Sequence, residues 1–224
     1  MLYAVPTPIG NLEDITVRAI RILKEVDLIL AEDTRVSKKL LSRYEISTPI
    51  ESFHSHNEHA RLESKITQLK EGQKIAIISD AGTPGISDPG YLLIRECVRE
   101  KIPVTCLPGP VAMIPAIVMS GIPCDKFYFE GFLPHKKGKQ TRIKYLLNLD
   151  SPFILYESPH RVLKTLEKIS DFCEKDRNVC VCREISKIHE ESIRGTLSTV
   201  IEEIKLRKTL KGEIVIVVDR ESRK

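Results

Sequence analysis

The sequence predicts an α/β protein of two α/β domains, with a mainly parallel sheet in the N-terminal domain and a mixed sheet in the C-terminal domain. In residues 1–107, short apolar runs alternate with amphipathic segments of helical length, which is typical of βαβ units. In the second half, strand-like runs follow one another with short connections, which favours partly antiparallel pairing. The small, proline-containing stretch 120–125 separates the halves, so we expect domains at residues 1–121 and 122–224 with a cleft between them.

The first half contains five strand-like runs with amphipathic segments between them. They end at about Pro6, Asp33, Phe53, Asp80 and Leu107. Ser55 and Glu58 have the spacing of a capping box at the start of one helix, and Gly72 lies where a glycine ends it. Pro110 suits the first turn of a further helix that runs to about Ser120.

The second half contains five more strand-like runs. They cover residues 127–132, 152–158, 178–184, 189–195 and 213–219. Ser158 and Pro159 are expected to begin a helix whose apolar stripe includes Val162, Leu166 and Ile169. The run 189–195 leads almost directly into the next segment, and this short connection is the reason for expecting a mixed sheet.

Composition limits the class of protein. Hydrophobic residues make up 42% of the chain and charged residues 29%, as in globular domains that bury a core. No apolar run approaches 18 residues and no secretory signal opens the chain, so we expect a cytoplasmic protein with no membrane span. The six cysteines show no CxxC spacing and lie mostly in apolar elements, which favours free thiols over disulfides or metal ligands.

Charge is distributed unevenly along the chain. Residues 1–123 hold 14 Lys+Arg against 15 Asp+Glu, a net charge of −1, whereas residues 124–224 hold 21 against 16, a net charge of +5. A polyanionic partner is therefore expected at the second half.

The loop SDAGTPGISDPG, residues 79–90, is the strongest candidate for a small-molecule site. It follows an apolar strand, begins with the carboxyl group of Asp80 and precedes a helix from about Tyr91. In an open α/β sheet, ligands bind outside the carboxyl ends of the strands, and glycines allow close backbone approach. The loop matches neither a GxxxxGK[ST] phosphate loop nor a GxGxxG turn. The alternative is a plain strand-to-helix connection whose glycines serve turn geometry.

Seven strings in order carry a resemblance to a known family. They are MLYAVPTPIGNLEDIT, AEDTR, SDAGTPGISDPG, LPGPVA, YESPHR, REISKIHEE and KGEIVIVV, and they span nearly the whole chain. Together they resemble the tetrapyrrole methylase superfamily and, within it, the ribosomal RNA small subunit methyltransferase I branch. That branch uses S-adenosylmethionine to methylate the ribose 2′-hydroxyl of a cytidine in the decoding region of 16S rRNA in the 30S subunit. The resemblance implies two α/β domains with the cofactor in the cleft.

The resemblance also implies which residues bind the cofactor. The first loop contributes Pro8 and Ile9, the second Asp80 and Thr83, and the start of the helix after LPGP contributes Val111 and Ala112. In the second domain, Tyr156, Glu157, Gly212 and Glu213 are expected around the adenine. Family members are often homodimers, and the apolar run VAMIPAIVM is one candidate interface. Longer members carry a helical extension after the final strand, whereas this sequence stops at Lys224.

Transfer to a ribose hydroxyl requires alignment and benefits from a base that accepts the proton. Glu184 is one candidate acceptor and Lys187 is another, if burial lowers its pKa; the alternative is that both are salt-bridge partners. The reaction needs no metal. The histidines His54, His56 and His59 are expected in a polar loop rather than at a metal.

A basic run is the candidate RNA-binding surface. It contains Lys136, Lys137, Lys139 and Arg142, with Phe132 and Tyr145 near it for stacking. Arg161 is a further candidate phosphate ligand. A solvated amphipathic helix is the alternative, and the stripe of Arg35, Lys38, Lys39 and Arg43 is a weaker second surface.

Two other functions stay open. A tetrapyrrole (precorrin-type) C-methyltransferase would share the fold and cofactor, but the first loop reads PTPIGNLED rather than a glycine-rich turn, and AGTPG rather than PxxYG follows Asp80. A non-catalytic RNA-binding or assembly protein that retains the cofactor pocket is the other alternative.

Overall fold

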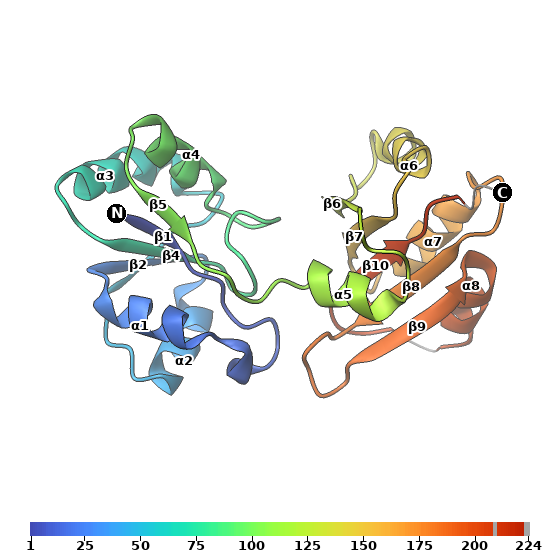
Figure 1. Ribbon diagram of the computed structural model, residues 1–224, viewed down its shortest axis with the longest axis horizontal. Helices are drawn as coiled ribbons and strands as arrows, with labels where there is room; N and C mark the ends of the chain where they lie inside the picture. The colour runs from blue at the N-terminus through green and yellow to red at the C-terminus, as the bar shows by residue number, and fades with distance from the viewer. Residues whose placement is uncertain (208–209, 222–224) are drawn as a thin grey trace. The chain divides into compact units, whose positions relative to one another are not determined.

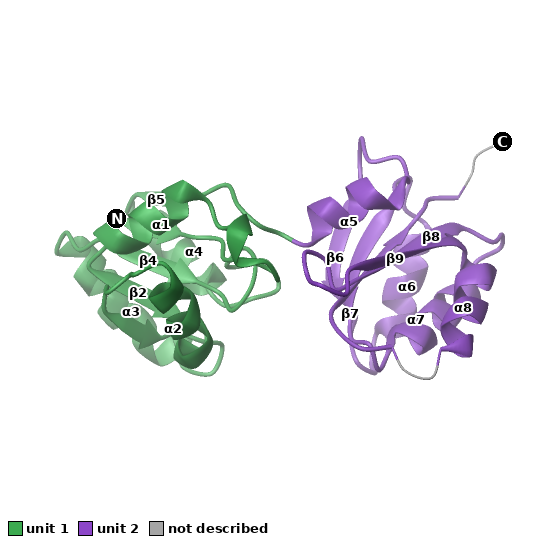
Figure 2. Ribbon diagram, turned by 90° about the horizontal axis from the view of Figure 1, so that it is seen from below, with its two compact units in different colours: residues 1–111 green, residues 112–224 purple. Residues whose placement is uncertain are grey.

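The computed structural model describes residues 1–207 and 210–221, and the chain divides into two compact units, Met1–Val111 and Ala112–Lys224 (Figure 2). This boundary lies earlier than the one predicted after residue 121. The difference is the helix α5 (Met113–Ser120), which packs against strands of the second unit's sheet. The predicted α/β class, with one parallel and one mixed sheet, is confirmed.

The first unit is a five-stranded parallel sheet in the order β3-β2-β4-β1-β5 (Figure 1). Its elements are β1 (Leu2–Ala4), the 3-10 turn η1 (Leu12–Asp14), α1 (Val17–Glu25), β2 (Leu28–Ala31), α2 (Thr34–Arg43), β3 (Ile50–Ser52), α3 (Glu58–Lys70), β4 (Ile75–Ile78), α4 (Tyr91–Arg99) and β5 (Val104–Cys106).

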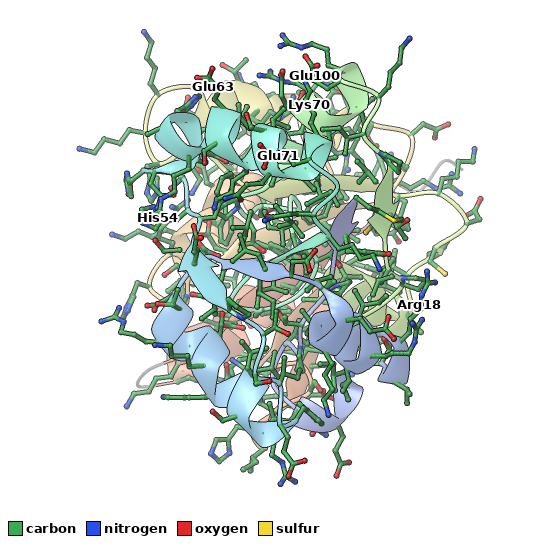
Figure 3. The ribbon with its side chains drawn as sticks, turned by 90° about the vertical axis from the view of Figure 1, so that its left-hand side faces the viewer. Arg18, His54, Glu63, Lys70, Glu71 and Glu100 are labelled. Atoms are coloured by element: carbon green, nitrogen blue, oxygen red, sulfur yellow. The ribbon has the colours of Figure 1, made fainter. Side chains whose placement is uncertain are left out.

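Two helices cover each face of this sheet, so its central strands are buried on both sides. In β4, Ala76 and Ile78 pack in the cluster beneath α1 and α2, while Ile75 and Ile77 pack in the cluster beneath α3 and α4 (Figure 1). Such continuous apolar strands are typical of parallel sheets. On the outer side, Lys70 of α3 and Glu100, just past α4, form an ion pair at 2.6 Å (Figure 3).

The strand order contains a topological switch point between β4 and β1. From β1 the chain crosses to β2 on one side, and from β4 it crosses to β5 on the other. When the connections after two adjacent strands run in opposite directions, the loops that follow these strands leave a crevice at the carboxyl edge of the sheet. α/β proteins bind ligands in this crevice. The loops after β1 and β4 are the two that the sequence singled out.

The second unit is a five-stranded mixed sheet in the order β6-β7-β10-β8-β9. The pair β6 and β7 is parallel, and every other neighbouring pair is antiparallel. With α5, its elements are β6 (Tyr128–Phe132), α6 (Lys139–Leu147), β7 (Phe153–Glu157), α7 (Val162–Ser170), β8 (Asn178–Arg183), β9 (Glu191–Thr196), α8 (Leu197–Leu206) and β10 (Ile214–Val218). Helices α6, α7 and α8 cover one face, and α5 lies on the other (Figure 2).

Three helix starts differ from the predictions. The N-cap of α3 is Asn57, not Ser55, because the Asn57 side chain accepts the N–H of His54 and closes the preceding turn at 2.8 Å. The N-cap of α7 is Arg161, three residues after Ser158. Helix α5 starts at Met113, since the carbonyl of Pro110 instead accepts a hydrogen bond from Thr83.

All six cysteines, which lie within the described residues, are free thiols; Cys97, Cys180 and Cys182 are buried, whereas Cys106 and Cys124 are exposed. Among the helices of residues 1–207 and 210–221, none combines the length and apolar character needed to cross a membrane.

Candidate functional site: a three-loop cradle in the first unit

The loops after β1, β4 and β5 are joined to one another at the carboxyl edge of the first sheet. Thr7 and Gly82 exchange two backbone hydrogen bonds, each 2.9 Å long. The Thr7 hydroxyl donates to the carbonyl of Ser79 at 3.0 Å, and the Thr83 hydroxyl donates to the carbonyl of Pro110 at 3.0 Å. Three loops far apart in the sequence are therefore joined by hydrogen bonds, and we call them together the three-loop cradle.

Glycine is required where these loops meet. Gly82 has φ +80°, which favours glycine, although a Cβ there would make only ordinary contacts, 3.6 Å from the Ile9 side chain and 3.9 Å from the Pro110 carbonyl. A Cβ on Gly109 would approach the Pro6 ring to 2.7 Å, so a side chain at Gly109 would push the first and third loops apart. The absence of side chains at these two glycines lets the backbones of the loops approach closely.

Carboxyl groups gather beside the cradle. Asp80 is exposed, and its Oδ1 accepts the N–H of Asp33 at 3.0 Å, which ties the ends of β2 and β4 together. Burial raises the pKa of Glu32, and the negative charge of Asp80 raises it further. Asp33 caps α2 and pairs with Arg35 at 2.7 Å, and hydrogen bonds from Arg35 lower the pKa of Asp33 to about 2. The cradle thus presents negative charge on one side.

The predicted first-unit residues Pro8, Ile9, Asp80 and Thr83 all lie on these loops, and Val111 ends the third loop. Ala112 is the N-cap of α5. The first amides of a helix have no acceptor within the helix, which suits contact with a ligand through backbone N–H groups.

Four predicted second-unit residues lie together. Lys187 pairs with Glu184 at 2.9 Å and with Glu213 at 3.2 Å, and Glu184 Oε1 also accepts the N–H of Glu213 at 2.9 Å. Gly212 has φ +96°, and a Cβ there would collide with the Glu184 side chain. We call this group the Glu184 cluster.

The electrostatics of the Glu184 cluster contradict one expectation. Hydrogen bonds from the Glu213 N–H and from Lys187 lower the pKa of Glu184. Burial alone would lower the pKa of Lys187, but hydrogen bonds and charge from Glu184 and Glu213 outweigh burial and raise it. The prediction that burial lowers the pKa of Lys187 is therefore wrong, because the partly buried lysine pairs with two carboxylates, Glu184 and the exposed Glu213. Any proton acceptor here is the carboxylate.

The side chains of Tyr156 and Glu157 point into different surroundings. Tyr156 contacts two phenylalanine rings of β6 and is partly buried. Glu157 is 3% exposed, and its carboxylate accepts hydrogen bonds from the Ser158 N–H and the Thr165 hydroxyl and pairs with Arg161 at 3.1 Å. A ligand contact by Glu157 would therefore use its backbone.

The predicted RNA-binding residues separate into two groups. Lys136 and Lys137 are exposed. Lys139 donates to Thr165 at 2.8 Å, and burial lowers its pKa. Arg142 pairs with Glu130, whose hydrogen bond raises the pKa of the arginine, and its guanidinium lies 4.5 Å from the Tyr145 ring.

Arg161 is also engaged within the unit. Besides Glu157, it contacts the ring of His135 at 2.8 Å and the carbonyl of Leu133 at 3.2 Å. These contacts anchor the loop that carries Lys136 and Lys137. Arg161 is thus a positioning residue for that loop.

The three loop histidines do not form a ligand set with other side chains. His54 and His56 meet edge to face with centroids 5.9 Å apart, and His54 follows β3 (Figure 3). In the described part of the chain, no group of three or more His, Cys, Asp or Glu side chains is arranged to hold a metal ion.

Sequence reasoning missed Glu32 and the contacts of Phe129. Glu32 belongs to the AEDTR string, and its place directly after an apolar strand was an available signal. Phe129 gave no signal, because an irregularity in β6 places it on the same face as Phe132, where both rings contact Tyr156.

Comparison with known proteins decides the family. A family model described as Tetrapyrrole (Corrin/Porphyrin) Methylases matches residues 1–201. The chain belongs to the tetrapyrrole methylase family. It is therefore a methyltransferase, as predicted from the seven strings.

Relatives of this tetrapyrrole methylase share a common name. Proteins named ribosomal RNA small subunit methyltransferase I are similar to it from Hydrogenobaculum sp. (48% identity; 99% of this chain, 96% of the relative), Thermotoga maritima (48%; 97% and 97%) and Escherichia coli O157:H7 (45%; 97% and 77%). Identity of this level over nearly the whole chain confirms the branch that the sequence suggested.

Solved structures agree at the level of the fold. A diphthine synthase superposes with a TM-score of 0.75 at 13% identity, covering 100% of this chain and 91% of that one. A uroporphyrin-III C-methyltransferase from Thermus thermophilus, complexed with S-adenosyl homocysteine, superposes with a TM-score of 0.65 at 14% identity, with 96% of each chain covered.

Proposed function

We propose that this protein is an S-adenosylmethionine-dependent methyltransferase of small-subunit ribosomal RNA, and that its acceptor is the 2′-hydroxyl of a cytidine in the decoding region of 16S rRNA. The observation that carries the proposal is the 48% identity to a protein named ribosomal RNA small subunit methyltransferase I over 99% of the chain. We further propose that the enzyme acts on the 30S subunit in the cytoplasm as a homodimer.

The three-loop cradle fits the cofactor. Bound S-adenosylmethionine supplies an electrophilic methyl group on a sulfonium centre. We propose that Asp80 holds the positively charged or hydroxyl-bearing part of the cofactor, because it is an exposed carboxylate fixed by the Asp33 N–H. We propose that the cofactor lies close to the backbone of Gly82 and Thr83 and to the turn at Pro8 and Ile9, since Gly82 has no side chain to fill the cradle.

The remaining site residues keep predicted roles. Val111 and Ala112 are proposed to donate backbone amides, and Tyr156, Glu157, Gly212 and Glu213 stay predictions as cofactor contacts of the second unit. Proton acceptance at Glu184 also stays a prediction. Because its lowered pKa makes the carboxylate a weak base, we expect alignment of the acceptor to contribute more than proton transfer.

The test is methyl transfer from radiolabelled S-adenosylmethionine to 30S subunits and to naked 16S rRNA from a strain that lacks ribose methylation. The position of the label is mapped by nuclease digestion. We expect 2′-O-methylcytidine in the decoding region. Tight cofactor binding without incorporation into either RNA would reject the proposal and leave a tetrapyrrole substrate or a non-catalytic role.

A matched pair of variants assigns the cofactor site. Asp80→Asn keeps an acceptor for the Asp33 N–H but removes the charge, and we expect cofactor affinity to fall about 10- to 150-fold, the equivalent of a charged hydrogen bond. The control is Asp27→Asn. Asp27 accepts the N–H of Lys74 at 2.7 Å, so it joins the flanks of the same two strands at the opposite, amino edge of the sheet. Asp27→Asn should bind the cofactor normally.

A further inference from the structure

Three aromatic side chains meet on the outer strands of the second sheet. The ring centroid of Tyr156 in β7 lies 5.0 Å from that of Phe129 and 5.7 Å from that of Phe132, both of β6, with edge-to-face geometry. Phe132 is 57% exposed, whereas Phe129 and Tyr156 are partly buried. We call these three residues the Phe132 platform.

A β-bulge builds the platform. In a regular strand, residues 129 and 132 point to opposite faces, because side chains alternate. The register between β6 and β7 shifts between Phe129 and Gly131, so Phe129 pairs with Ile154 and Phe132 pairs with Tyr156. Gly131 takes φ +73°, a conformation that suits glycine. The extra residue places both phenylalanines on one face, and bulges commonly redirect a side chain in this way.

The face that carries the platform is the one that α6, α7 and α8 do not cover. Tyr156 pairs across the sheet with Val215, and Val215 pairs with Cys182, so the three side chains lie in one row on one face. On that face α5 packs over β8, β9 and β10, as the contact of the Cys182 thiol with the Ala116 carbonyl shows. Strand β6 is at the edge of the sheet (Figure 1), and Phe132 is open to solvent there.

The chain that follows the platform is basic. The chain runs from Phe132 directly into the loop with the exposed Lys136 and Lys137, and Arg161 anchors that loop through Leu133 and His135. The second unit as a whole carries 21 basic against 16 acidic residues. An exposed aromatic ring beside a basic loop suits a single-stranded nucleic acid, whose bases stack on aromatic side chains while lysines contact the phosphates.

We propose that Phe132 stacks on an unpaired base of the RNA substrate, with Tyr156, which itself packs against Phe129, holding the Phe132 ring in place. The inference rests on the proposed function and deepens it, because it assigns the surface that binds the RNA strand. The proposal also assigns a function to the β6 bulge, which brings Phe132 to the open face of the sheet. A regular strand would place Phe132 on the face covered by α6, α7 and α8.

The test compares Phe132→Ala with Phe132→Trp. Affinity for a fluorescein-labelled single-stranded RNA of the decoding-region sequence is measured by anisotropy, affinity for S-adenosylmethionine by calorimetry, and mass in solution by light scattering. We expect Phe132→Ala to weaken RNA binding about ten-fold or more, as for other base–aromatic stacks, and Phe132→Trp to restore it. Cofactor affinity and mass should not change. Tyr91→Ala is the matched control, since Tyr91 is a similarly exposed aromatic residue of the first unit, at 61%.

Three results would overturn the inference. RNA affinity of Phe132→Ala within two-fold of wild type would exclude stacking. A loss of cofactor affinity would assign the platform to the adenine of S-adenosylmethionine. A change in mass would assign it to a second copy of the chain. Methyl transfer by the wild-type protein is measured in parallel, so failure of the proposed function is seen separately from failure of the platform.

Discussion

Gly212 shows how a single residue can depend on a distant side chain. Its φ of +96° disfavours any residue with a Cβ, and that Cβ would collide with Glu184. Gly72 has nearly the same φ, +95°, with nothing within 4 Å of the Cβ position. We predict that Gly72→Ala lowers the free energy of unfolding by about 1 kcal/mol from backbone strain, and that Gly212→Ala lowers it by about 1–3 kcal/mol more.

The measurement is urea unfolding of both variants. The difference between the two losses of unfolding free energy measures the cost of the collision with Glu184, since the backbone strain is common to both variants. Equal losses in the two variants would contradict the prediction and show that Glu184 moves aside at little cost.

Glu184 itself should give the stability a dependence on acid pH. Its pKa is lowered in the folded protein by the Glu213 N–H and by Lys187, relative to about 4.3 in an unfolded chain. A lowered folded pKa means that the stabilisation is present above about pH 4.3 and is lost as the pH falls through the folded value. Wild type should therefore lose its advantage over Glu184→Gln as the pH is lowered from above about 4.3 through the acid range below it.

The check is the free energy of unfolding of wild type and Glu184→Gln across that range. Glu202→Gln, on the exposed side of α8, controls for removal of a carboxyl group. If the difference in unfolding free energy between wild type and Glu184→Gln does not change with pH, the charge of Glu184 contributes nothing to stability.

Residue types were predictable from the sequence, but residue partnerships were not. Asp80 and the glycines after it could be placed in a loop at the carboxyl end of a strand, because a carboxyl group and flexible residues follow an apolar run; that this loop binds a ligand stays a prediction. The engagement of Lys139 by Thr165, or of Arg161 by Glu157, depends on how α6 and α7 pack on β7. Spacing along one chain does not carry that information, so these residues were expected at an RNA surface.

At the scale of elements, the start of α1 is fixed by a side-chain cap. The Thr16 hydroxyl accepts the N–H of Ala19 at 3.0 Å and caps the helix. We predict that Thr16→Ala lowers the free energy of unfolding by about 1 kcal/mol, because one N–H of the first turn loses its acceptor. Thr16→Ser should retain most of the stability, and thermal unfolding monitored by circular dichroism distinguishes the two. If both variants lose the same stability, the methyl group rather than the cap is responsible.

The strands and helices followed the hydrophobic pattern closely, whereas helix caps did not. Patterning works because burial on a sheet face or a helix face imposes a period of 2 or 3.6 residues. Caps depend on local turns, as at Asn57, whose amide closes the turn from His54 instead of capping α3. The bulge at Gly131 left no pattern at all, because one extra residue is visible only when the partner strand is known.

At the scale of the whole molecule, charge is the property that separates the two units. Residues 1–111 carry a net charge of −1 and residues 112–224 a net charge of +5. These values equal those of residues 1–123 and 124–224, because residues 112–123 contain no charged side chain. An RNA that binds through phosphates should therefore depend chiefly on the second unit, and within it on lysines that are not engaged elsewhere. Of the five predicted RNA-binding residues, Lys136 and Lys137 are the exposed pair.

We predict that the double variant Lys136→Ala/Lys137→Ala weakens binding of single-stranded RNA. The slope of log affinity against log salt should fall by about 1.4, or about 0.7 for each phosphate that a lysine no longer neutralises. The control is Lys38→Ala/Lys39→Ala on α2, which removes the same charge from the first unit. Anisotropy titrations between about 50 and 200 mM salt give both slopes. A slope that falls equally in the two variants would mean either that total charge governs binding or that the second candidate surface at Lys38 and Lys39 also contacts phosphates. A fall confined to Lys136 and Lys137 would mean that phosphates contact the loop beside Phe132.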